Sequence, residues 1–200
     1  RYVHLSTGNY NPRTARLYTD LGFFSADAEL AADVDKVFLT LASGVAAKPH
    51  RQLLTAPSQL HASMLTLLAR VAAAARAGHP ARVVLKMNAL TDLDLIAALI
   101  AASQAGAKID LIVRGACMLP PGLPGQTDNI RVRSVVGRFL EHSRICYFRW
   151  GLDDADEALY LSSADWMGRN MFRRVEVAWP VRDAALRQRV IDDGSIGACC

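Results

Sequence analysis

The spacing of hydrophobic and polar positions changes about a quarter of the way along the chain. Over residues 28–42, apolar side chains recur at three- and four-residue intervals, which predicts an amphipathic helix with Ser25 as its N-cap. Beyond residue 52, short apolar runs alternate with helical segments. The expected order is a strand at 53–56, a helix at 58–77, a strand at 83–87, a helix at 93–103 and a strand at 108–113. This alternation is typical of βαβ units and a parallel sheet.

Polar residues and shorter apolar runs complete the expected fold. Ser58 is the expected N-cap of the first of these two helices, and Thr91 or Asp92 is the expected N-cap of the second. The other strands are expected at 2–5, 130–136, 145–148, 158–161 and 175–178, and a closing helix at 183–191. We therefore predict an α/β fold with a mostly parallel sheet.

The change of pattern near residues 45–52 also predicts a boundary. Residues 1–48 are expected to form the end of one unit, residues 49–193 a nearly whole second unit, and residues 194–200 an irregular tail. The helix at 28–42 then belongs to the first unit, and the alternating strands and helices belong to the second.

Two loops resemble each other closely enough to suggest that these units are copies. Residues 5–10 (LSTGNY) align with residues 161–166 (LSSADW), and the same register places Asp20 on Glu176. Each segment is a strand end, two hydroxyl residues, a small residue, an amide or acid, and an aromatic residue. A duplicated unit explains this similarity. The active site would then lie between the two copies, each contributing one loop.

Composition narrows the class of protein. Hydrophobic residues make up 52% of the chain and charged residues 21%, as in folded globular proteins. The longest apolar run is shorter than the roughly 18–20 residues that span a bilayer. The four cysteines show no CxxC spacing, so we expect no structural zinc site and a reducing, cytoplasmic setting.

The basic residues are mostly arginine. The 23 basic residues comprise 19 arginines and 4 lysines, and the net charge is only +4, too small to indicate nucleic-acid binding by itself. The planar guanidinium suits phosphate and carboxylate groups. A GC-rich genome would produce the same excess of arginine, so composition leaves both explanations open.

His142 and Arg144 form the first candidate for chemistry. They stand two positions apart at the start of an expected strand, so they point to the same side. An imidazole can attack phosphorus or protonate a leaving oxygen, and a guanidinium can hold the anion. A purely structural histidine is the simpler interpretation. The later Ser163, Asp165 and Asn170 favour a functional one.

Further arginines follow the expected strands. Arg131 and Arg133 share one face of a strand, which suits a channel for a chain of phosphates. Arg138 lies nearby, and Arg169 follows the second loop. The alternative is a solvated edge strand that carries protective charges.

The residues around His142 resemble one half of a phospholipase D active site, a superfamily in which two such halves face each other. The matching features are the histidine, a basic residue two positions later and a strand that ends in a hydroxyl loop. This resemblance implies a phospholipase D-like α/β sandwich. The chain departs from the pattern at Arg144, where lysine is usual, and at Arg149, where aspartate is usual. These departures weaken the case for diester hydrolysis.

Longer blocks resemble the bacterial type of polyphosphate kinase. The blocks are spread over residues 1 to about 182: 2–4 (YVH), 7–11 (TGNYN), 14–20 (TARLYTD), 105–106 (AG), 110–115 (DLIVRG), 128–131 (DNIR), 136–144 (VGRFLEHSR) and 162–167 (SSADWM). Membership of this family implies reversible transfer of the terminal phosphate of ATP to inorganic polyphosphate, through a phosphohistidine and with Mg²⁺.

The resemblance also implies roles for individual residues. Tyr18 would stack on adenine, and Arg114 and His142 would contact the phosphates, with His142 as the second histidine of the site. Supporting phosphate contacts are expected from Asn9, Arg131, Arg133, Arg138, Arg144, Ser163, Asp165 and Arg169.

The resemblance places the phosphorylated histidine and the magnesium ligands before Arg1. We therefore expect this chain to be a C-terminal fragment with no metal ligands and no kinase activity of its own. The expected partners are ATP or ADP, polyphosphate and further copies of the enzyme, without nucleic acid and with at most peripheral membrane contact. The alternatives are a phospholipase D-like phosphodiesterase and a non-catalytic polyanion-binding module.

Overall fold

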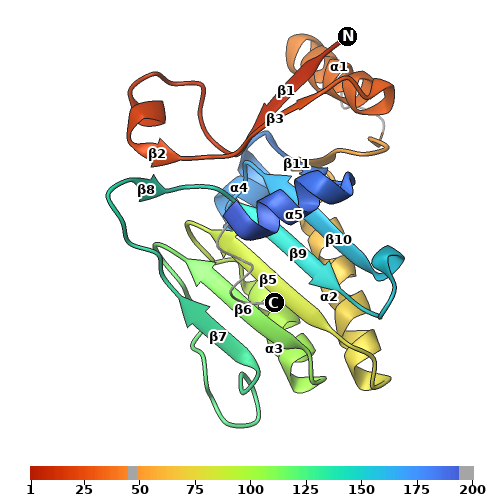
Figure 1. The fold of residues 1–200 in the computed structure, drawn as a ribbon, viewed down its shortest axis with the longest axis vertical. Coiled ribbons are helices and arrows are strands. Elements are labelled where there is room, and N and C mark those ends of the chain that lie inside the picture. The colour runs from red at the N-terminus through yellow and green to blue at the C-terminus, as the bar shows by residue number, and fades with distance from the viewer. Residues whose placement is uncertain (45–48, 194–200) are drawn as a thin grey trace.

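A seven-stranded sheet forms the centre of the molecule in the computed structural model, which describes residues 1–44 and 49–193 (Figure 1). In spatial order the strands are β4 (Leu54–Ala56), β11 (Glu176–Pro180), β10 (Glu157–Ser162), β9 (Ile145–Arg149), β5 (Arg82–Met87), β6 (Lys108–Val113) and β7 (Ile130–Arg133). The expected α/β fold is therefore present.

Most strands of the sheet run in one direction, but most neighbouring strands are antiparallel. β5, β6 and β7 pair in parallel. The pairs β5·β9, β9·β10, β10·β11 and β11·β4 are antiparallel. Five of the seven described strands thus run one way, but four of their six pairings are antiparallel. The mostly parallel sheet is confirmed for strand direction, and the antiparallel pairings arise because β9 and β11 run the opposite way. Residues 150–156 between β9 and β10 are too few for the crossover that parallel neighbours need.

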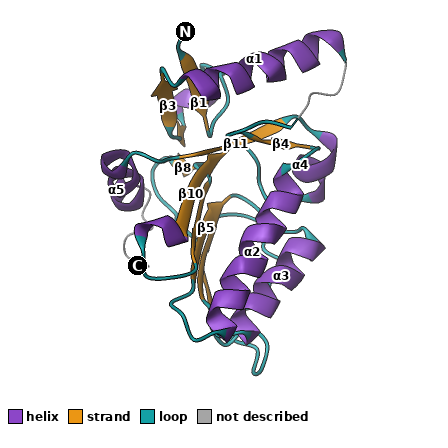
Figure 2. Ribbon diagram, turned by 90° about the vertical axis from the view of Figure 1, so that its right-hand side faces the viewer, coloured by secondary structure: helices purple, strands orange, loops and turns teal. Residues whose placement is uncertain are grey.

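Two long helices cover one face of the sheet, α2 (Leu60–Arg76) and α3 (Leu93–Gln104), with the short α4 (Gly168–Arg173) beside them (Figure 2). Leu68, Val71 and Leu99 are fully buried there. Asp92 caps α3 as expected, since its carboxylate accepts a hydrogen bond from the Leu95 N–H. The expected cap of α2 was wrong: Ser58 does not cap it, and its hydroxyl lies 2.9 Å from that of Thr55.

The helix expected at residues 28–42 is α1 (Ala28–Ser43). Asp27 caps it in place of the expected Ser25, because its carboxylate accepts the Leu30 N–H at 2.7 Å. The buried carboxylate of Asp33 accepts the backbone N–H groups of Gln52 and Leu53. These bonds fasten the first part of the chain to the strand that begins the main sheet.

The similarity of the two loops extends into a structural repeat. β1 (Val3–Ser6) and β3 (Gly22–Ser25) form an antiparallel pair in which Leu5 faces Phe23. In the β10·β11 pair, Leu161 faces Trp179. The offset is 156 positions in both strands, as from Leu5 to Leu161. The helix after each pair keeps the same offset, with α1 starting at Ala28 and α5 (Ala184–Asp193) at Ala184.

The two strand pairs pack against each other through a shared core. Val3 and Leu5 belong to the same buried cluster as Leu159, Leu161 and Trp179. The rings of Phe23 and Trp179, which occupy equivalent positions in the repeat, lie 6.4 Å apart between centroids. Residues 1–44 are therefore held on the main sheet by apolar packing as well as by the bonds of Asp33.

A small parallel sheet joins residues far apart in the sequence: β2 (Tyr18–Thr19) pairs with β8 (Leu140–Glu141). The sequence patterns did not predict β2, β3, β8 or α4. The 3-10 helices are η1 (Thr14–Arg16) and η2 (Asp154–Asp156). None of the described helices is long and apolar enough to cross a membrane. Residues 45–48 of the expected boundary and the tail at 194–200 lie outside the described residues.

Candidate active site

His142 stands where the N-terminal segment of the chain meets β8, and the β2·β8 pairing places it there. Thr19 pairs with Glu141, and the His142 N–H donates to the Thr19 carbonyl at 3.1 Å. Asp20 directly follows β2 and His142 directly follows β8, so these two residues are neighbours. A contact between residues 122 positions apart thus follows from the register of a two-residue strand.

Asp20 and His142 form a hydrogen-bonded pair. The His142 Nδ1 lies 2.9 Å and 3.0 Å from the two carboxylate oxygens of Asp20, and the Thr7 hydroxyl donates to Asp20 at 2.8 Å. A carboxylate on Nδ1 fixes the ring orientation and favours the proton on Nδ1, so that Nε2 carries the lone pair that can exchange a proton. The ring of Tyr18 lies 4.8 Å from that of His142. The sequence aligned Asp20 with Glu176 and gave it no role.

Arg144 lies beside His142, as the two-residue spacing predicted. Its NH1 is 3.2 Å from each ring nitrogen of His142 and donates to the Thr7 carbonyl at 2.8 Å. Its NH2 and Nε bind the Asp165 carboxylate at 2.9 Å and 3.3 Å. Both side chains of this ion pair are about nine-tenths buried. Arg144 therefore connects the first loop to the second.

The Asp165 carboxylate is held in its ionised form. Burial alone would raise the pKa of Asp165. The Arg144 guanidinium and the backbone N–H groups of Asn88 and Ala89 outweigh burial, and the net effect is a lowered pKa. A depressed pKa contributes stability that is present above the ordinary range of aspartate and lost as the pH falls through the folded-state value.

We expect the free energy of unfolding to fall as the pH is lowered from about 5 to about 3, with Asp165 contributing to the slope. The Asp165→Asn variant is expected to be less stable at neutral pH and to show a shallower decline. Urea unfolding at a series of pH values measures both slopes. Equal slopes for the two proteins would show that Asp165 titrates alike when folded and unfolded.

Arg114 follows β6 and points at a cavity of about 400 Å³. Tyr18, Arg138, Phe139 and Glu141 also line this cavity. The Asn88 Oδ1 accepts hydrogen bonds from Arg114 Nε at 3.0 Å and NH2 at 2.9 Å. The structure thus brings three residues that the sequence singled out, Tyr18, Arg114 and Arg138, to one hollow.

A buried ion pair, absent from the sequence-based candidates, underlies this hollow. Lys86 is 3% exposed, and its Nζ lies 3.0 Å from the Glu141 carboxylate, which also accepts from the Ser143 hydroxyl. Burial would raise the pKa of Glu141, but Lys86, Thr19 and Ser143 lower it overall. The pair fastens β8 to β5 and so fixes the strand that precedes His142.

The second loop repeats the hydrogen bonding of the first. The Thr7 hydroxyl accepts the Leu21 N–H and donates to Asp20. The Ser163 hydroxyl accepts the Val177 N–H and donates to Glu176 at 2.5 Å. Glu176 therefore occupies the position equivalent to Asp20.

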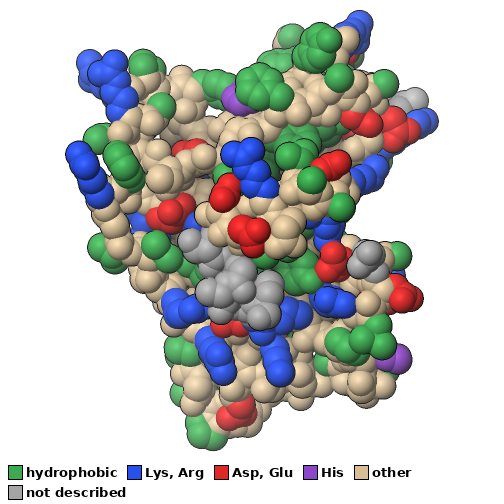
Figure 3. Space-filling view, in the orientation of Figure 1, with side chains coloured by type: hydrophobic (Ala, Val, Ile, Leu, Met, Phe, Trp, Pro, Cys, Tyr) green, Lys and Arg blue, Asp and Glu red, His purple; other side chains and the backbone are tan. Residues whose placement is uncertain are grey.

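The other expected phosphate contacts lie on the surface. Arg131 and Arg133 are exposed on the edge strand β7, and Arg133 is 4.0 Å from Asp110. Arg169 is exposed on α4, and Asn9 is exposed in the loop after β1. Lys and Arg side chains gather over the lower part of the sheet, on the face opposite α2 and α3 (Figure 3). Of the eight expected supporting contacts, Arg144 and Asp165 belong to the buried network around His142.

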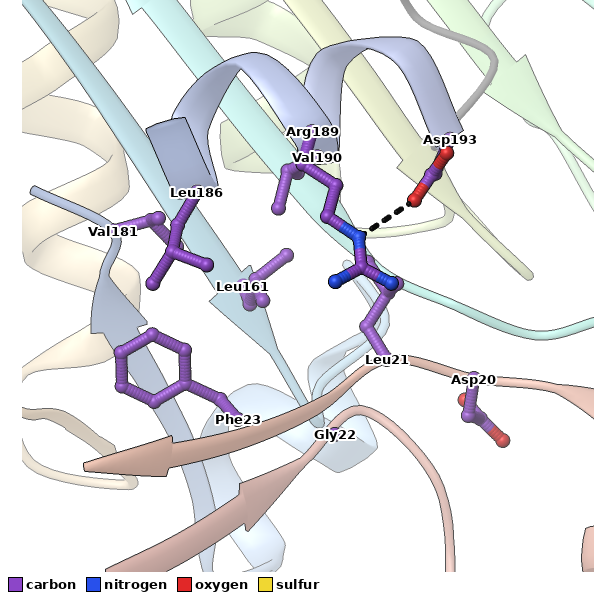
Figure 4. A pocket seen from close by; sticks show the side chains of 10 residues that line it. All are labelled: Asp20, Leu21, Gly22, Phe23, Leu161, Val181, Leu186, Arg189, Val190 and Asp193. Carbon is purple, nitrogen blue, oxygen red and sulfur yellow. Dashed lines mark hydrogen bonds and ion pairs between the residues drawn. The ribbon is translucent and has the colours of Figure 1, made fainter. Parts of the chain in front are cut away.

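A second hollow adjoins Asp20 from the other side. It has a volume of about 260 Å³ and lies between β3 and α5, with Phe23, Leu161 and Val190 in its wall (Figure 4). Its charged groups include Arg189 and Asp193, which pair with each other at 3.1 Å. Because the arginine of this hollow is paired with Asp193, whereas Arg114 and Arg138 both line the 400 Å³ cavity, that cavity is the better candidate for an anionic substrate.

Comparison with known proteins decides the family. Residues 53–193 match the family model described as polyphosphate kinase C-terminal domain 2, and residues 1–47 match polyphosphate kinase C-terminal domain 1. This chain belongs to the polyphosphate kinase family. The resemblance predicted from the sequence is confirmed.

Similar polyphosphate kinases are much longer than this chain. It is 55% identical over 194 residues to a polyphosphate kinase of Burkholderia ambifaria (strain MC40-6), covering 97% of this chain and 28% of the relative. A Paraburkholderia phytofirmans polyphosphate kinase is also 55% identical, over 195 residues. The crystal structure of polyphosphate kinase from Porphyromonas gingivalis superposes with a TM-score of 0.88 at 40% identity, covering 96% of this chain and 29% of that one.

Proposed function

We propose that the whole protein is an ATP:polyphosphate phosphotransferase, which moves the terminal phosphate of ATP reversibly to polyphosphate through a phosphohistidine. The observation that carries this proposal is the position of the His142–Asp20 pair: His142 packs on Tyr18, which shares its cavity with Arg114. An aromatic face, a guanidinium and an oriented imidazole are the groups that a nucleoside triphosphate and its transfer require.

Each of these groups would act on a different part of ATP. The ring of Tyr18 offers a face for adenine. The Arg114 guanidinium binds phosphate oxygens, and Nε2 of His142 binds the transferred phosphate or exchanges a proton with it. Asp20 holds Nδ1 of His142. In this arrangement the barrier is lowered mainly by positioning and by positive charge around the phosphoryl group.

Glu176 would serve the phosphorylated histidine. Asp20 binds His142 of the other unit, and Glu176 is its equivalent in the repeat. In the transfer, a ring nitrogen of the upstream histidine forms a bond to the terminal phosphorus while the bond to the bridging oxygen breaks and ADP leaves. A terminal oxygen of polyphosphate then displaces the ring nitrogen. The 200-residue chain without that histidine is expected to make no polyphosphate.

Magnesium would assist by neutralising phosphate charge, and its hard carboxylate ligands must come from elsewhere in the whole protein. The carboxylates of Asp20, Glu141 and Asp165 are already paired with His142, Lys86 and Arg144. Within residues 1–44 and 49–193, the group with metal-ligand spacing is His61, Asp92 and Asp94, where Asp92 is the cap of α3. The residues around His142 therefore do not fit a magnesium site.

The resemblance supplies the remaining proposals. The whole enzyme would be a cytoplasmic homo-oligomer that needs ATP or ADP and polyphosphate and no nucleic acid. The direct test is the formation of polyphosphate from ATP by the purified whole protein. Cleavage of a phosphodiester in the absence of ATP, without polyphosphate formation, would instead support a phospholipase D-like activity.

The Tyr18→Leu variant is expected to raise KM for ATP about tenfold, because stacking of a base on an aromatic ring contributes about 1–3 kcal/mol. The turnover number should change less, since the adenine lies away from the reacting phosphate. Steady-state synthesis of polyphosphate measures both constants. Tyr18→Phe keeps the ring and serves as the matched control. A KM equal to that of the unaltered protein in Tyr18→Leu would remove Tyr18 from nucleotide binding.

A further inference from the structure

Asn88 connects the two arginines of the candidate site. It is the first residue after β5 and is 8% exposed. Its Oδ1 accepts hydrogen bonds from Nε and NH2 of Arg114, at 3.0 Å and 2.9 Å. Its Nδ2 lies 3.5 Å from Asp165 Oδ2, and its backbone N–H donates to Asp165 Oδ1 at 2.7 Å. Asp165 in turn binds Arg144.

A side-chain amide is the group that this position requires. The oxygen must accept from a guanidinium, and the nitrogen must donate toward a carboxylate. A carboxylate at position 88 would face Asp165 without a donor, and an aliphatic side chain would bind neither neighbour. The hydrogen bonds run without a break from Arg114 through Asn88, Asp165 and Arg144 to His142.

The backbone fixes Arg114 against the same residue. The Arg114 N–H donates to the Met87 carbonyl, and the Gly115 N–H donates to the Asn88 carbonyl at 2.7 Å. A Cβ at Gly115 would lie 2.8 Å from that carbonyl oxygen, so the close approach depends on glycine. The ends of β5 and β6 are thereby locked together, and the Arg114 side chain starts from a defined point.

We propose that Asn88 is a positioning residue for ATP: it holds the Arg114 guanidinium in the orientation that meets the phosphates. This role rests on the proposed function. Two of the guanidinium nitrogens, Nε and NH2, bind Asn88 Oδ1, and the Arg114 side chain so held lines the same cavity as Tyr18. An arginine fixed in this way loses less conformational entropy when an anion binds than a free one does.

The test is a double-mutant cycle in the whole protein with Asn88→Leu, Arg114→Gln and the combined variant. Asn88→Leu is expected to raise KM for ATP about tenfold with a smaller change in kcat, since ordering a long side chain costs binding energy of that order. Arg114→Gln is expected to raise KM further. The combined variant should match Arg114→Gln within about twofold, because Asn88 acts through Arg114.

A merely structural role would give a different pattern. Asn88→Asp keeps the shape of the side chain and adds a negative charge beside Arg114, so it should also raise KM for ATP. If Asn88→Leu does not fold, Asn88→Asp takes its place in the cycle. Asn129→Leu is the matched control, because Asn129 is an amide directly before β7 whose Nδ2 donates to the Ser103 carbonyl, away from Arg114. A lowered unfolding temperature with an unchanged KM, or additive effects in the cycle, would overturn the proposal.

Failure of the proposed function would look different from failure of this inference. If the unaltered protein makes no polyphosphate, the proposed function fails, and Asn88 is judged by calorimetric titration with ATP. The positioning role would still be supported if Asn88→Leu binds ATP more weakly than the unaltered protein does. Arg114→Gln and the combined variant should then bind ATP equally. Unchanged ATP binding in Asn88→Leu, or no ATP binding by the unaltered protein, would refute it.

Discussion

Replacing His142 by glutamine is expected to lower kcat for polyphosphate synthesis by about 10²- to 10⁴-fold, the usual contribution of a positioned acid–base group. Glutamine reaches a similar distance and still forms hydrogen bonds, but its amide neither takes up nor releases a proton near neutral pH. The bond to Asp20 can be kept, since an amide N–H donates to a carboxylate. The loss would therefore report the chemistry of the imidazole more than its packing.

The pH–rate profile of the whole protein is the decisive measurement. We expect the limb due to a histidine to disappear in His142→Gln. His61→Gln is a matched control, because the His61 Nε2 also lies 3.0 Å from an aspartate, Asp92, but on α2. That variant should keep the rate and the profile of the unaltered protein. An unchanged rate and profile in His142→Gln would remove His142 from the mechanism.

Replacing Arg144 by leucine is expected to reduce the free energy of unfolding by about 3–5 kcal/mol, because it leaves the charge of a buried partner uncompensated. Asp165 would lose the Nε and NH2 bonds of Arg144, and the Thr7 carbonyl and His142 would lose the NH1 contact. Such a loss is a large fraction of the stability of an ordinary domain. The site between the two loops would lose its main connection.

Urea unfolding of the 200-residue chain at neutral pH measures this effect. Arg189→Leu is the matched control: Arg189 pairs with Asp193 on α5, its side chain is 76% exposed, and its removal should change stability by less than about 1 kcal/mol. Arg144→Lys keeps the charge but lacks the planar guanidinium that binds three partners. Its loss of unfolding free energy should therefore lie between those of Arg144→Leu and Arg189→Leu. A loss below about 1 kcal/mol in Arg144→Leu would contradict a stabilising buried network.

The local sequence determined the elements that depend on local periodicity and capping. The helices α1, α2 and α3 and the strands β5, β6 and β9 lie within a few residues of their expected ranges, because apolar spacing reports which face of an element is buried. Two caps were misplaced: Asp27 takes the N–H group expected for Ser25, and the Ser58 hydroxyl contacts Thr55 instead of capping α2. The domain boundary near residues 45–52 stays a prediction.

The sequence also determined the family and part of the site. The order and spacing of the blocks between residues 2 and 167 indicated polyphosphate kinase, and the two-residue spacing of His142 and Arg144 predicted that they lie on the same side. The resemblance of the loops at 5–10 and 161–166 predicted the repeat. These features are visible in the sequence because they consist of residue order and short spacings along the chain.

The tertiary structure decided the partners of those residues. Asp20 meets His142 across 122 positions, Asn88 meets Asp165 across 77, and Arg114 meets Asn88 across 26. Pairing of β2 with β8 creates the first of these contacts, the antiparallel insertion of β9 between β5 and β10 the second, and parallel pairing of β5 with β6 the third. A buried charge needs a partner but the sequence does not say which, because that choice depends on strand register and sheet order.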